Sequence, residues 1–328
     1  MRIFNLIKNN RHKLCLELMG TFYDVSCVVD YLKDLSVPKE YFADTTVSKN
    51  FLIHNDIISS LEKIEHSLLK HIESPNHPSW IESSKIVEDF RYAPPIPIPP
   101  LLFGLAGNCP QTWRTTGTRI PNYPVGYVRP WQSIAGHKSR VILDHSVTSF
   151  RCAAELGIVI GKTAYKVNKK KAMEYILGYT IVNDMIGNQW KNFANQNNPN
   201  QNPTFHELLI TSYYGRGTDG FAPIGPAIVS KSEIKNPYDL LMYTSLNGNI
   251  KDRSHTNAMV VGIENTIEYL SQFMTLLPGT IIHMGTMGID GITIPEDYFI
   301  REKVSVDIEI EQIGKLSIFF CDRRESAQ

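Results

Sequence analysis

The sequence predicts an α+β fold that is mostly β. Strand-like segments dominate the chain after residue 100, and only two helical patterns interrupt them. Near the C-terminus, apolar and polar residues alternate over Val304–Ile310, and a Gly314-Lys315 turn leads into Leu316–Phe320. This alternation around a turn is typical of a β-hairpin. We therefore expect long, mostly antiparallel β structure with few helices.

Length, charge and cysteine content favour a cytoplasmic protein with a small-molecule partner. The chain has 328 residues, enough for one large core and one smaller module, and its 33 basic residues balance its 33 acidic ones. No long like-charged run indicates a nucleic-acid partner, and no apolar segment is long enough to cross a bilayer. The five cysteines are scattered and form no C-x-x-C pair, which disfavours a disulfide framework and a thiolate zinc site.

A small α+β domain is expected over residues 1–93. Short apolar runs at Leu14–Leu16 and Asp24–Val28 favour strands, and Ile57–Ile72 repeats apolar residues at helical spacing. The prolines of residues 94–100 remove backbone donors and fix φ, so this stretch is the expected joint. The larger domain then occupies residues 101–328.

The larger domain alternates expected strands with two helices. One helix begins after Asn168 as N-cap and ends at Gly178, and the other places Ile263, Ile267, Leu270 and Met274 on one face. The polar, proline-broken segment Asn195–Pro203 is expected to be a loop. The expected strands are Leu156–Ile160, Tyr179–Val182, Ala227–Val229, Leu241–Leu246, Thr280–His283 and Val304–Ile310.

Six ordered motifs resemble the fumarylacetoacetate hydrolase family. They cover most of the chain, together with the small domain and its proline-rich joint. The resemblance implies a large domain of rolled, barrel-like β-sheet, a homodimer, and a divalent metal, Mg²⁺ or Mn²⁺, that chelates substrate oxygens and stabilises an enolate. It also implies action on 1,3-dicarbonyl or 2-oxo acid compounds. The motifs are residues 154–162 (AELGIVIGK), 178–184 (GYTIVND), 215–226 (GRGTDGFAPIGP), 246–248 (LNG), Thr256 with Met259, and 278–280 (PGT) leading into 285–286 (GT).

The resemblance assigns Glu155 and Asp184 as metal ligands and catalytic residues. In the family, two glutamates at i and i+2 on one strand and an aspartate on the next hold the metal, because that spacing aims the glutamates at one face. Here the first glutamate position holds Ala153. Losing one anionic ligand weakens metal attraction, although magnesium tolerates one or two protein carboxylates, so metal binding stays open.

A second departure lies in the segment that resembles the family's glycine-rich stretch, residues 104–113. Many hydrolytic members carry a histidine there that serves as general base for water, and Thr112 stands at the matching place. A threonine hydroxyl cannot accept a proton at neutral pH as imidazole can. The usual hydrolytic route is therefore disfavoured. Thr112 and Trp113 are instead candidate substrate-binding residues, and Trp113 could equally serve packing.

Four further residues complete the candidate site. Arg129 matches a basic family residue near the substrate carboxylate, and Arg216 stands in place of a family lysine. Both are interpreted as oxyanion or carboxylate clamps, Arg216 with a catalytic role, and structural ion pairing is the alternative. Thr286 matches a catalytic threonine that hydrogen-bonds substrate oxygen, unless it merely bonds its own turn. Tyr127 is an expected substrate contact.

Three hypotheses of function follow. The first is an enzyme of this superfamily, altered for C–C cleavage, decarboxylation, tautomerisation, dehydration or cyclisation of a 1,3-dicarbonyl or 2-oxo acid, within specialised metabolism and with reduced or no metal dependence. The second is a conventional magnesium-dependent hydrolase or decarboxylase. The third is a pseudoenzyme that binds a ligand. Retention of Glu155, Asp184, Arg216 and Thr286 together favours the enzymes, because a scaffold does not need charged residues in a pocket.

Overall fold

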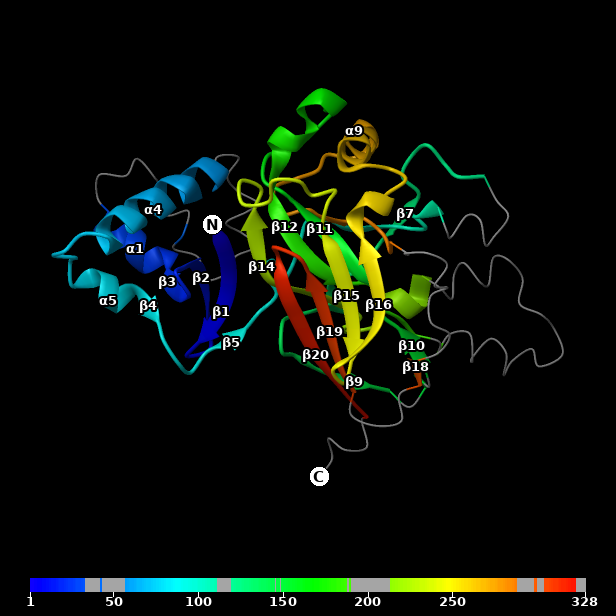
Figure 1. Ribbon diagram of the computed structural model, residues 1–328, viewed down its shortest axis with the longest axis horizontal. Helices are drawn as coiled ribbons and strands as arrows, with labels where there is room; N and C mark the ends of the chain where they lie inside the picture. The colour runs from blue at the N-terminus through cyan, green and yellow to red at the C-terminus, as the bar shows by residue number, and fades with distance from the viewer. Residues whose placement is uncertain are drawn as a thin grey trace.

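The structure is a computed structural model in which two large sheets pack on each other (Figure 1). It describes residues 1–32, 42, 57–110, 119–144, 146–147, 149–187, 189, 213–287, 298–299 and 304–322. The predicted mostly β, α+β fold class is confirmed. None of the described helices combines the length and apolar character needed to cross a bilayer.

Within these residues the largest sheet has twelve strands. They are β1 (Arg2–Lys8), β2 (Arg11–Leu18), β3 (Thr21–Asp24), β4 (Lys85–Ile86), β5 (Arg91–Tyr92), β6 (Leu102–Leu105), β7 (Gly126–Val128), β8 (Ile134–Ala135), β11 (Ala154–Ile160), β12 (Ile176–Asn183), β14 (Ala222–Ser230) and β17 (Ile281–His283). The order is β4-β3-β2-β1-β14-β12-β11-β17-β6-β7, with β5 on β1 and β8 on β14. Because β1 pairs with β14, the sheet runs on from the small N-terminal region into the larger one.

A second described sheet contains the predicted hairpin. Its strands are β9 (Arg140–Leu143), β15 (Leu241–Leu246), β16 (Asn249–His255), β19 (Val304–Ile310) and β20 (Gly314–Asp322), in the order β16-β15-β19-β20-β9. The hairpin is confirmed: β19 and β20 pair antiparallel from Val304 with Phe320 to Ile310 with Gly314. A smaller described sheet joins β13 (Ile186–Gly187), β10 (Ser149–Arg151) and β18 (Tyr298–Phe299).

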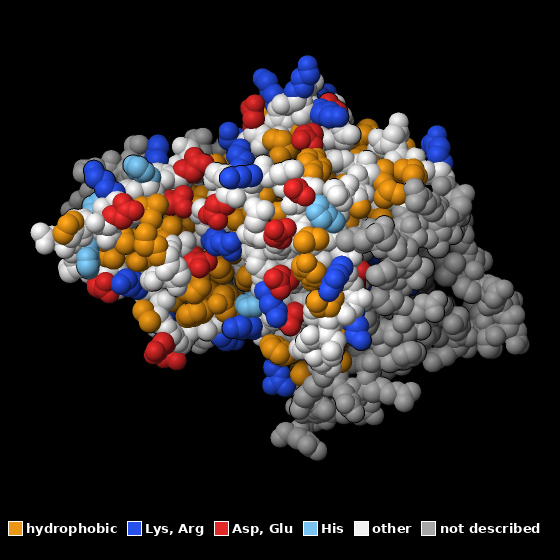
Figure 2. Space-filling view, in the orientation of Figure 1, with side chains coloured by type: hydrophobic (Ala, Val, Ile, Leu, Met, Phe, Trp, Pro, Cys, Tyr) orange, Lys and Arg blue, Asp and Glu red, His pale blue; other side chains and the backbone are white. Residues whose placement is uncertain are grey.

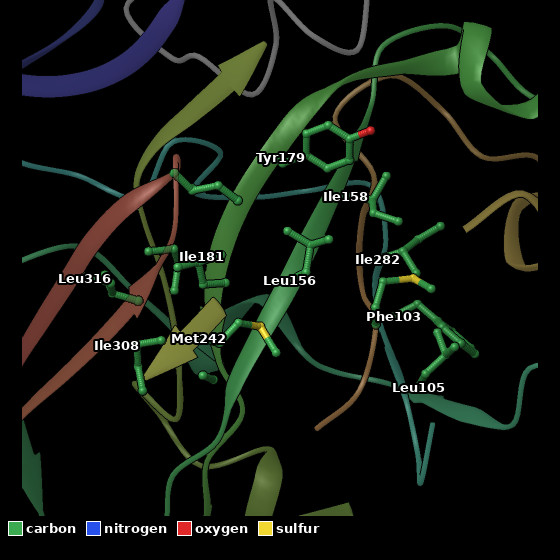
Figure 3. Close-up of a cluster of buried hydrophobic side chains, with 14 of the residues drawn as sticks. Phe103, Leu105, Leu156, Ile158, Tyr179, Ile181, Met242, Ile282, Ile308 and Leu316 are labelled. Carbon is green, nitrogen blue, oxygen red and sulfur yellow. The ribbon is translucent and has the colours of Figure 1, made fainter. Parts of the chain in front are cut away.

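The main core fills the space between the two large sheets. Leu156 and Ile158 of β11 share this core with Met242, Ile308 and Leu316 of the second sheet, and each of these side chains is fully buried (Figure 3). Burying a side chain of this size contributes about 1.5–3 kcal/mol. The same cluster takes Ile282 from β17 and Phe103 and Leu105 from β6. Every second side chain of β6, β11 and β17 therefore faces this core, and the side chains between them face the other way.

Helices cover part of that other face. The described helices are α1 (Val25–Tyr31), α4 (Ile57–Ile72), α5 (Trp80–Ser84), α9 (Ile263–Phe273) and the 3₁₀ helices η1 (Trp131–Ser133), η2 (Lys169–Tyr175) and η3 (Thr256–Ala258). The predicted helix over Ile57–Ile72 is confirmed, and Leu61 and Ile64 on its apolar stripe are fully buried. They share a core cluster with Val159 of β11 and Ile281 of β17. The N-terminal helices thus cover one end of the face opposite the main core.

Two local predictions were wrong. Asp24–Val28 was expected to be a strand, but the strand ends at Asp24, whose side chain accepts the Ser26 N–H at 3.0 Å and caps α1. The helix expected up to Gly178 ends at Tyr175 and is 3₁₀, because strand β12 begins at Ile176. Its predicted N-cap is confirmed, since Asn168 accepts the Lys170 N–H.

Charges of both signs are mixed over the visible surface. On the face shown in Figure 2, acidic and basic side chains lie interspersed among apolar ones, and neither sign forms a continuous field. Such a surface does not steer a highly charged polymer.

Candidate active site

A row of residues across five strands forms the floor of the site. Glu155 of β11 lies opposite Val182 of β12, and Asp184 is two residues beyond Val182, so both carboxylates share one sheet face. On the other side of β11, His283 of β17 lies opposite Gly157, which is two residues from Glu155. The row then continues through β6 to Tyr127 of β7. This is the face not used by the main core.

The Glu155 carboxylate accepts hydrogen bonds from three groups that follow one another on the chain. His283 Nδ1 lies 2.5 Å and the Gly285 N–H 3.0 Å from Oε2, while the Thr286 hydroxyl donates to Oε1 at 2.8 Å. Glu155 is only 1% exposed. Burial raises the pKa of this carboxyl, and His283 acts in the opposite direction.

The Asp184 carboxylate lies between two guanidinium groups. Arg129 Nη1 donates to Oδ1, the Tyr127 hydroxyl donates to the same oxygen at 3.0 Å, and Arg216 Nε lies 3.2 Å from Oδ2. Burial alone would raise the pKa of Asp184, but the nearby cations, Arg216 before Arg129, lower it to about 2. Asp184 is therefore an anion at any physiological pH.

Arg129 is a buried anchor of this cluster. Its side chain is fully buried, and its Nη2 donates to the backbone carbonyls of Met185, Arg216 and Phe221. Because the carbonyl of Arg216 is among these acceptors, Arg129 also fixes the backbone that carries the second cation. Planar arginine suits such a multiple contact better than lysine.

Arg216 and Tyr127 form the solvent-facing part of the cluster. The Arg216 side chain is 22% exposed, and its guanidinium lies 4.8 Å from the centre of the Tyr127 ring. Thr286 is likewise half-buried, whereas Glu155, Asp184 and Arg129 lie below. The arrangement presents a cation, a phenol ring and a hydroxyl over a buried layer of charges.

Gly104 and His283 belong to the same arrangement, and the sequence interpretation missed both. The edge of the Tyr127 ring packs on the His283 ring with centroids 5.9 Å apart. A Cβ at Gly104 would overlap Cε1 and Nε2 of His283, so only glycine leaves room for the imidazole. The available signal was a histidine at the end of the apolar run Ile281-Ile282, just before Gly285-Thr286.

The structure brings six predicted site residues into this arrangement: Glu155, Thr286, Asp184, Arg129, Tyr127 and Arg216. Thr112, Trp113 and the loop Asn195–Pro203 lie outside the described residues. Ala153 is buried next to the site, and its backbone carbonyl accepts the Asp184 N–H at 3.0 Å. Its methyl group supplies no ligand where the resemblance implies a glutamate.

The residues present do not fit a divalent cation. Each carboxylate already accepts three protein donors, and the positive charges of Arg129 and Arg216 balance the negative charges of Glu155 and Asp184. A divalent ion would add two uncompensated charges to a buried site. Across the described residues, no group of three His, Cys, Asp or Glu side chains is placed to hold a metal ion.

Comparison with known proteins establishes the family. Residues 103–318 match the Fumarylacetoacetate (FAA) hydrolase C-terminal family, and this range contains the whole floor of the site. The chain belongs to the fumarylacetoacetate hydrolase family. The resemblance seen in the six motifs is thereby confirmed.

Two curated relatives show the range of chemistry in this family. A 4-hydroxyphenylacetate degradation bifunctional isomerase/decarboxylase of Salmonella dublin is 34% identical over 197 residues, which cover 60% of this chain and 41% of the relative. A mitochondrial oxaloacetate tautomerase of Rattus norvegicus is 31% identical over 196 residues, covering 60% and 58%. The matches span less than two thirds of the length of either relative.

Solved structures of low identity share the fold over nearly the whole chain. Maleylpyruvate hydrolase from Sphingobium sp. SYK-6, in complex with manganese(II) and pyruvate, has a TM-score of 0.69 at 18% identity, covering 98% of this chain and 99% of that one. Fumarylacetoacetate hydrolase from Exiguobacterium antarcticum has a TM-score of 0.70 at 21% identity, covering 98% and 100%.

Proposed function

We propose that this enzyme forms an enolate from a 2-oxo acid or 1,3-dicarbonyl compound and does not hydrolyse it. In decarboxylation the C–C bond to the carboxylate breaks, CO2 leaves and the bonding electrons stay on the enolate; in tautomerisation the α-proton passes to solvent and a proton returns from it. Neither reaction needs a water that attacks carbon, so these two are the reactions that this chemistry supports best. The observation that carries the proposal is the placement of Arg216, which is held by Asp184, lies over Tyr127 and is part-exposed.

Arg216 suits the charge that develops in such a reaction. An enolate or carboxylate oxygen is an anion, and a fixed guanidinium at the solvent-facing side of a buried charge layer stabilises it without reorganisation. Arginine does not release a proton near neutrality, so Arg216 is a clamp for an oxyanion and not an acid. Thr286, tied to Glu155, is proposed to hydrogen-bond a second substrate oxygen. Arg129 supports this layer from below.

Relatives of this chain support the choice of substrate class. One is named as an isomerase/decarboxylase and another as an oxaloacetate tautomerase, and a structural neighbour was crystallised with pyruvate. Oxaloacetate and pyruvate are 2-oxo acids. The proposal also includes reduced or no metal dependence, a role in specialised metabolism, a homodimer, which sedimentation would test, and a cytoplasmic location, which fluorescence microscopy of a tagged chain would test.

The manganese in that neighbour keeps a metal-dependent hydrolase or decarboxylase as the second candidate. The two candidates differ in a direct assay. Purified enzyme is given oxaloacetate or an acylpyruvate, with magnesium or with EDTA, and enol absorbance, pyruvate release and acyl cleavage are followed. We expect enol exchange or decarboxylation that persists in EDTA. Acyl cleavage that requires magnesium would establish the second candidate, and no turnover would favour a ligand-binding protein.

Arg216→Gln tests the residue that carries the proposal. Loss of a preorganised charged donor is expected to lower kcat/KM by about 10²–10³-fold. Arg253→Gln is the matched control, because the exposed Arg253 guanidinium also lies over a tyrosine ring, 6.0 Å from the centre of Tyr243. The control should keep wild-type kcat/KM. Equal rates for the two variants would contradict the role of Arg216.

A further inference from the structure

We infer that His283 takes the place of a metal ion as the partner of Glu155 and so makes the site independent of divalent cations. The imidazole, held in a notch at Gly104, engages the carboxylate that would otherwise ligate an ion. This inference deepens the proposed function and rests on it for the identity of the site.

His283 and two neighbouring groups point hydrogen-bond donors at the Glu155 carboxylate. When Glu155 is ionised its carboxylate only accepts, and the Nδ1 atom of His283 then carries the hydrogen that points at Oε2. The Gly285 N–H points at the same oxygen, and the Thr286 hydroxyl points at Oε1. Nδ1 of His283 and the Gly285 N–H both engage Oε2, so an approaching cation would compete with these two donors for its lone pairs.

The imidazole of His283 is held rigidly by its neighbours. His283 is fully buried, its backbone lies between β11 and β6, and its Nε2 packs against the α-carbon side of Gly104. The Tyr127 ring closes another side. Within the described part of the chain, Nε2 has no hydrogen-bond partner, which fits a ring held by packing and by its single bond to Glu155. The ring cannot swing away to admit an ion without displacing these neighbours.

Ala153, two residues before Glu155 on the chain, also disfavours a metal ion. Ala153 stands where the family pattern places a further carboxylate, and its methyl group is buried. Removal of that anion and addition of an imidazole act in the same direction, since both lower the attraction of the site for a cation. Because Gly104 has no side chain, there is room for the His283 imidazole beside Glu155. We therefore assign His283 as a positioning residue, which fixes Glu155 and through it Thr286.

Metal binding tests this inference without the need for turnover. The full-length protein is titrated with Mn²⁺ and free ion is followed by electron paramagnetic resonance. Wild-type protein is expected to show no saturable site below millimolar Mn²⁺, and EDTA is expected to leave its rate unchanged. The double variant Ala153→Glu/His283→Ala restores the carboxylate and removes the imidazole. Its Mn²⁺ affinity should be at least about 10- to 100-fold higher than that of wild type.

A conservative variant separates positioning from simple packing. His283→Asn keeps an N–H donor near the place of Nδ1 and should retain a larger share of kcat than His283→Ala, with KM little changed. Asp239→Asn is the matched control, because it breaks another imidazole–carboxylate pair, His255 with Asp239 at 3.3 Å, outside the site. It should change neither kcat nor Mn²⁺ binding.

The results decide the inference independently of the reaction. One tight Mn²⁺ site per wild-type chain would overturn it, as would a folded double variant that gains no Mn²⁺ affinity. If the double variant does not fold, the wild-type titration decides alone: a saturable site refutes the inference and its absence supports it. Missing turnover with 2-oxo acids would instead refute the proposed function and leave the metal result intact.

Discussion

Replacement of Gly104 by alanine should disrupt the site by displacing the His283 ring that contacts Glu155. The added Cβ would overlap two ring atoms of His283 and come within 3.0 Å of Cζ of Tyr127. Overpacking of a rigid core costs about 1–3 kcal/mol, and loss of the charge-assisted bond to Glu155 adds about 1.5–3 kcal/mol. The variant should therefore lose about 2.5–6 kcal/mol of unfolding free energy and most of its turnover.

Urea unfolding followed by tryptophan fluorescence measures this loss. Gly217→Ala is the control: its nearest Cβ contact, Cγ of Pro130, is an ordinary 3.5 Å away, so its unfolding free energy should stay within about 0.5 kcal/mol of wild type. A second test combines Gly104→Ala with His283→Ala, which removes the clashing ring. The pair should be at least about 1 kcal/mol more stable than the sum of the single losses predicts. A loss of unfolding free energy in Gly104→Ala no larger than that of the control, or strict additivity in the double variant, would refute the role of Gly104 in making room for the His283 ring.

Most strands could be predicted because their signals are local. Alternation over Val304–Ile310 and the Gly314 turn specify a hairpin with no information from elsewhere in the chain. The segment Asp24–Val28 failed for the opposite reason. Its β-branched valines favour a strand, but the Asp24 cap and the burial of Val25 and Val28 beside the sheet override that preference.

The sequence predicted which residues belong to the candidate site, apart from Gly104 and His283, but not which of them contact one another. Motif matching supplied Glu155, Asp184 and Arg216, but it could not show that Asp184 lies between two arginines while Glu155 pairs with a histidine. Those partners depend on strand register across long separations, 128 residues in the case of His283 and Glu155. A lone histidine in an apolar strand carries no sign of its partner until the register is known.

The register also explains how this site tolerates so many buried charges. Each carboxylate has its own set of donors from a different strand end, and the two arginines beside Asp184 also balance the charge of Glu155. Breaking one pair leaves an unpaired buried charge, which costs far more than the net worth of the pair. The cluster is thus fixed as a unit, and the part-exposed Arg216 is the member best placed to respond to a substrate anion.

Two further perturbations test the electrostatics of the fold. Asp184→Asn leaves the buried Arg129 cation unpaired, so it should cost about 3–5 kcal/mol in urea unfolding and abolish turnover; a loss below about 1 kcal/mol would contradict the buried pair. His137 makes stability depend on pH. Its Nδ1 accepts the Ser317 N–H at 3.0 Å, which requires a neutral ring, and burial, aided by the charge of Lys138, lowers its pKa to about 4. The unfolded chain takes up this proton near pH 6.5 and the folded chain does not, so this stabilisation is complete above about pH 6.5 and is lost as pH falls toward 4. With allowance for solvent screening of a half-buried ring, the loss is about 1–2 kcal/mol. Urea midpoints at pH 7 and pH 5 measure this loss. The difference between the two midpoints should be smaller in His137→Gln than in wild type, because the variant lacks the titrating ring. An unchanged difference in that variant would assign the pH dependence to other groups.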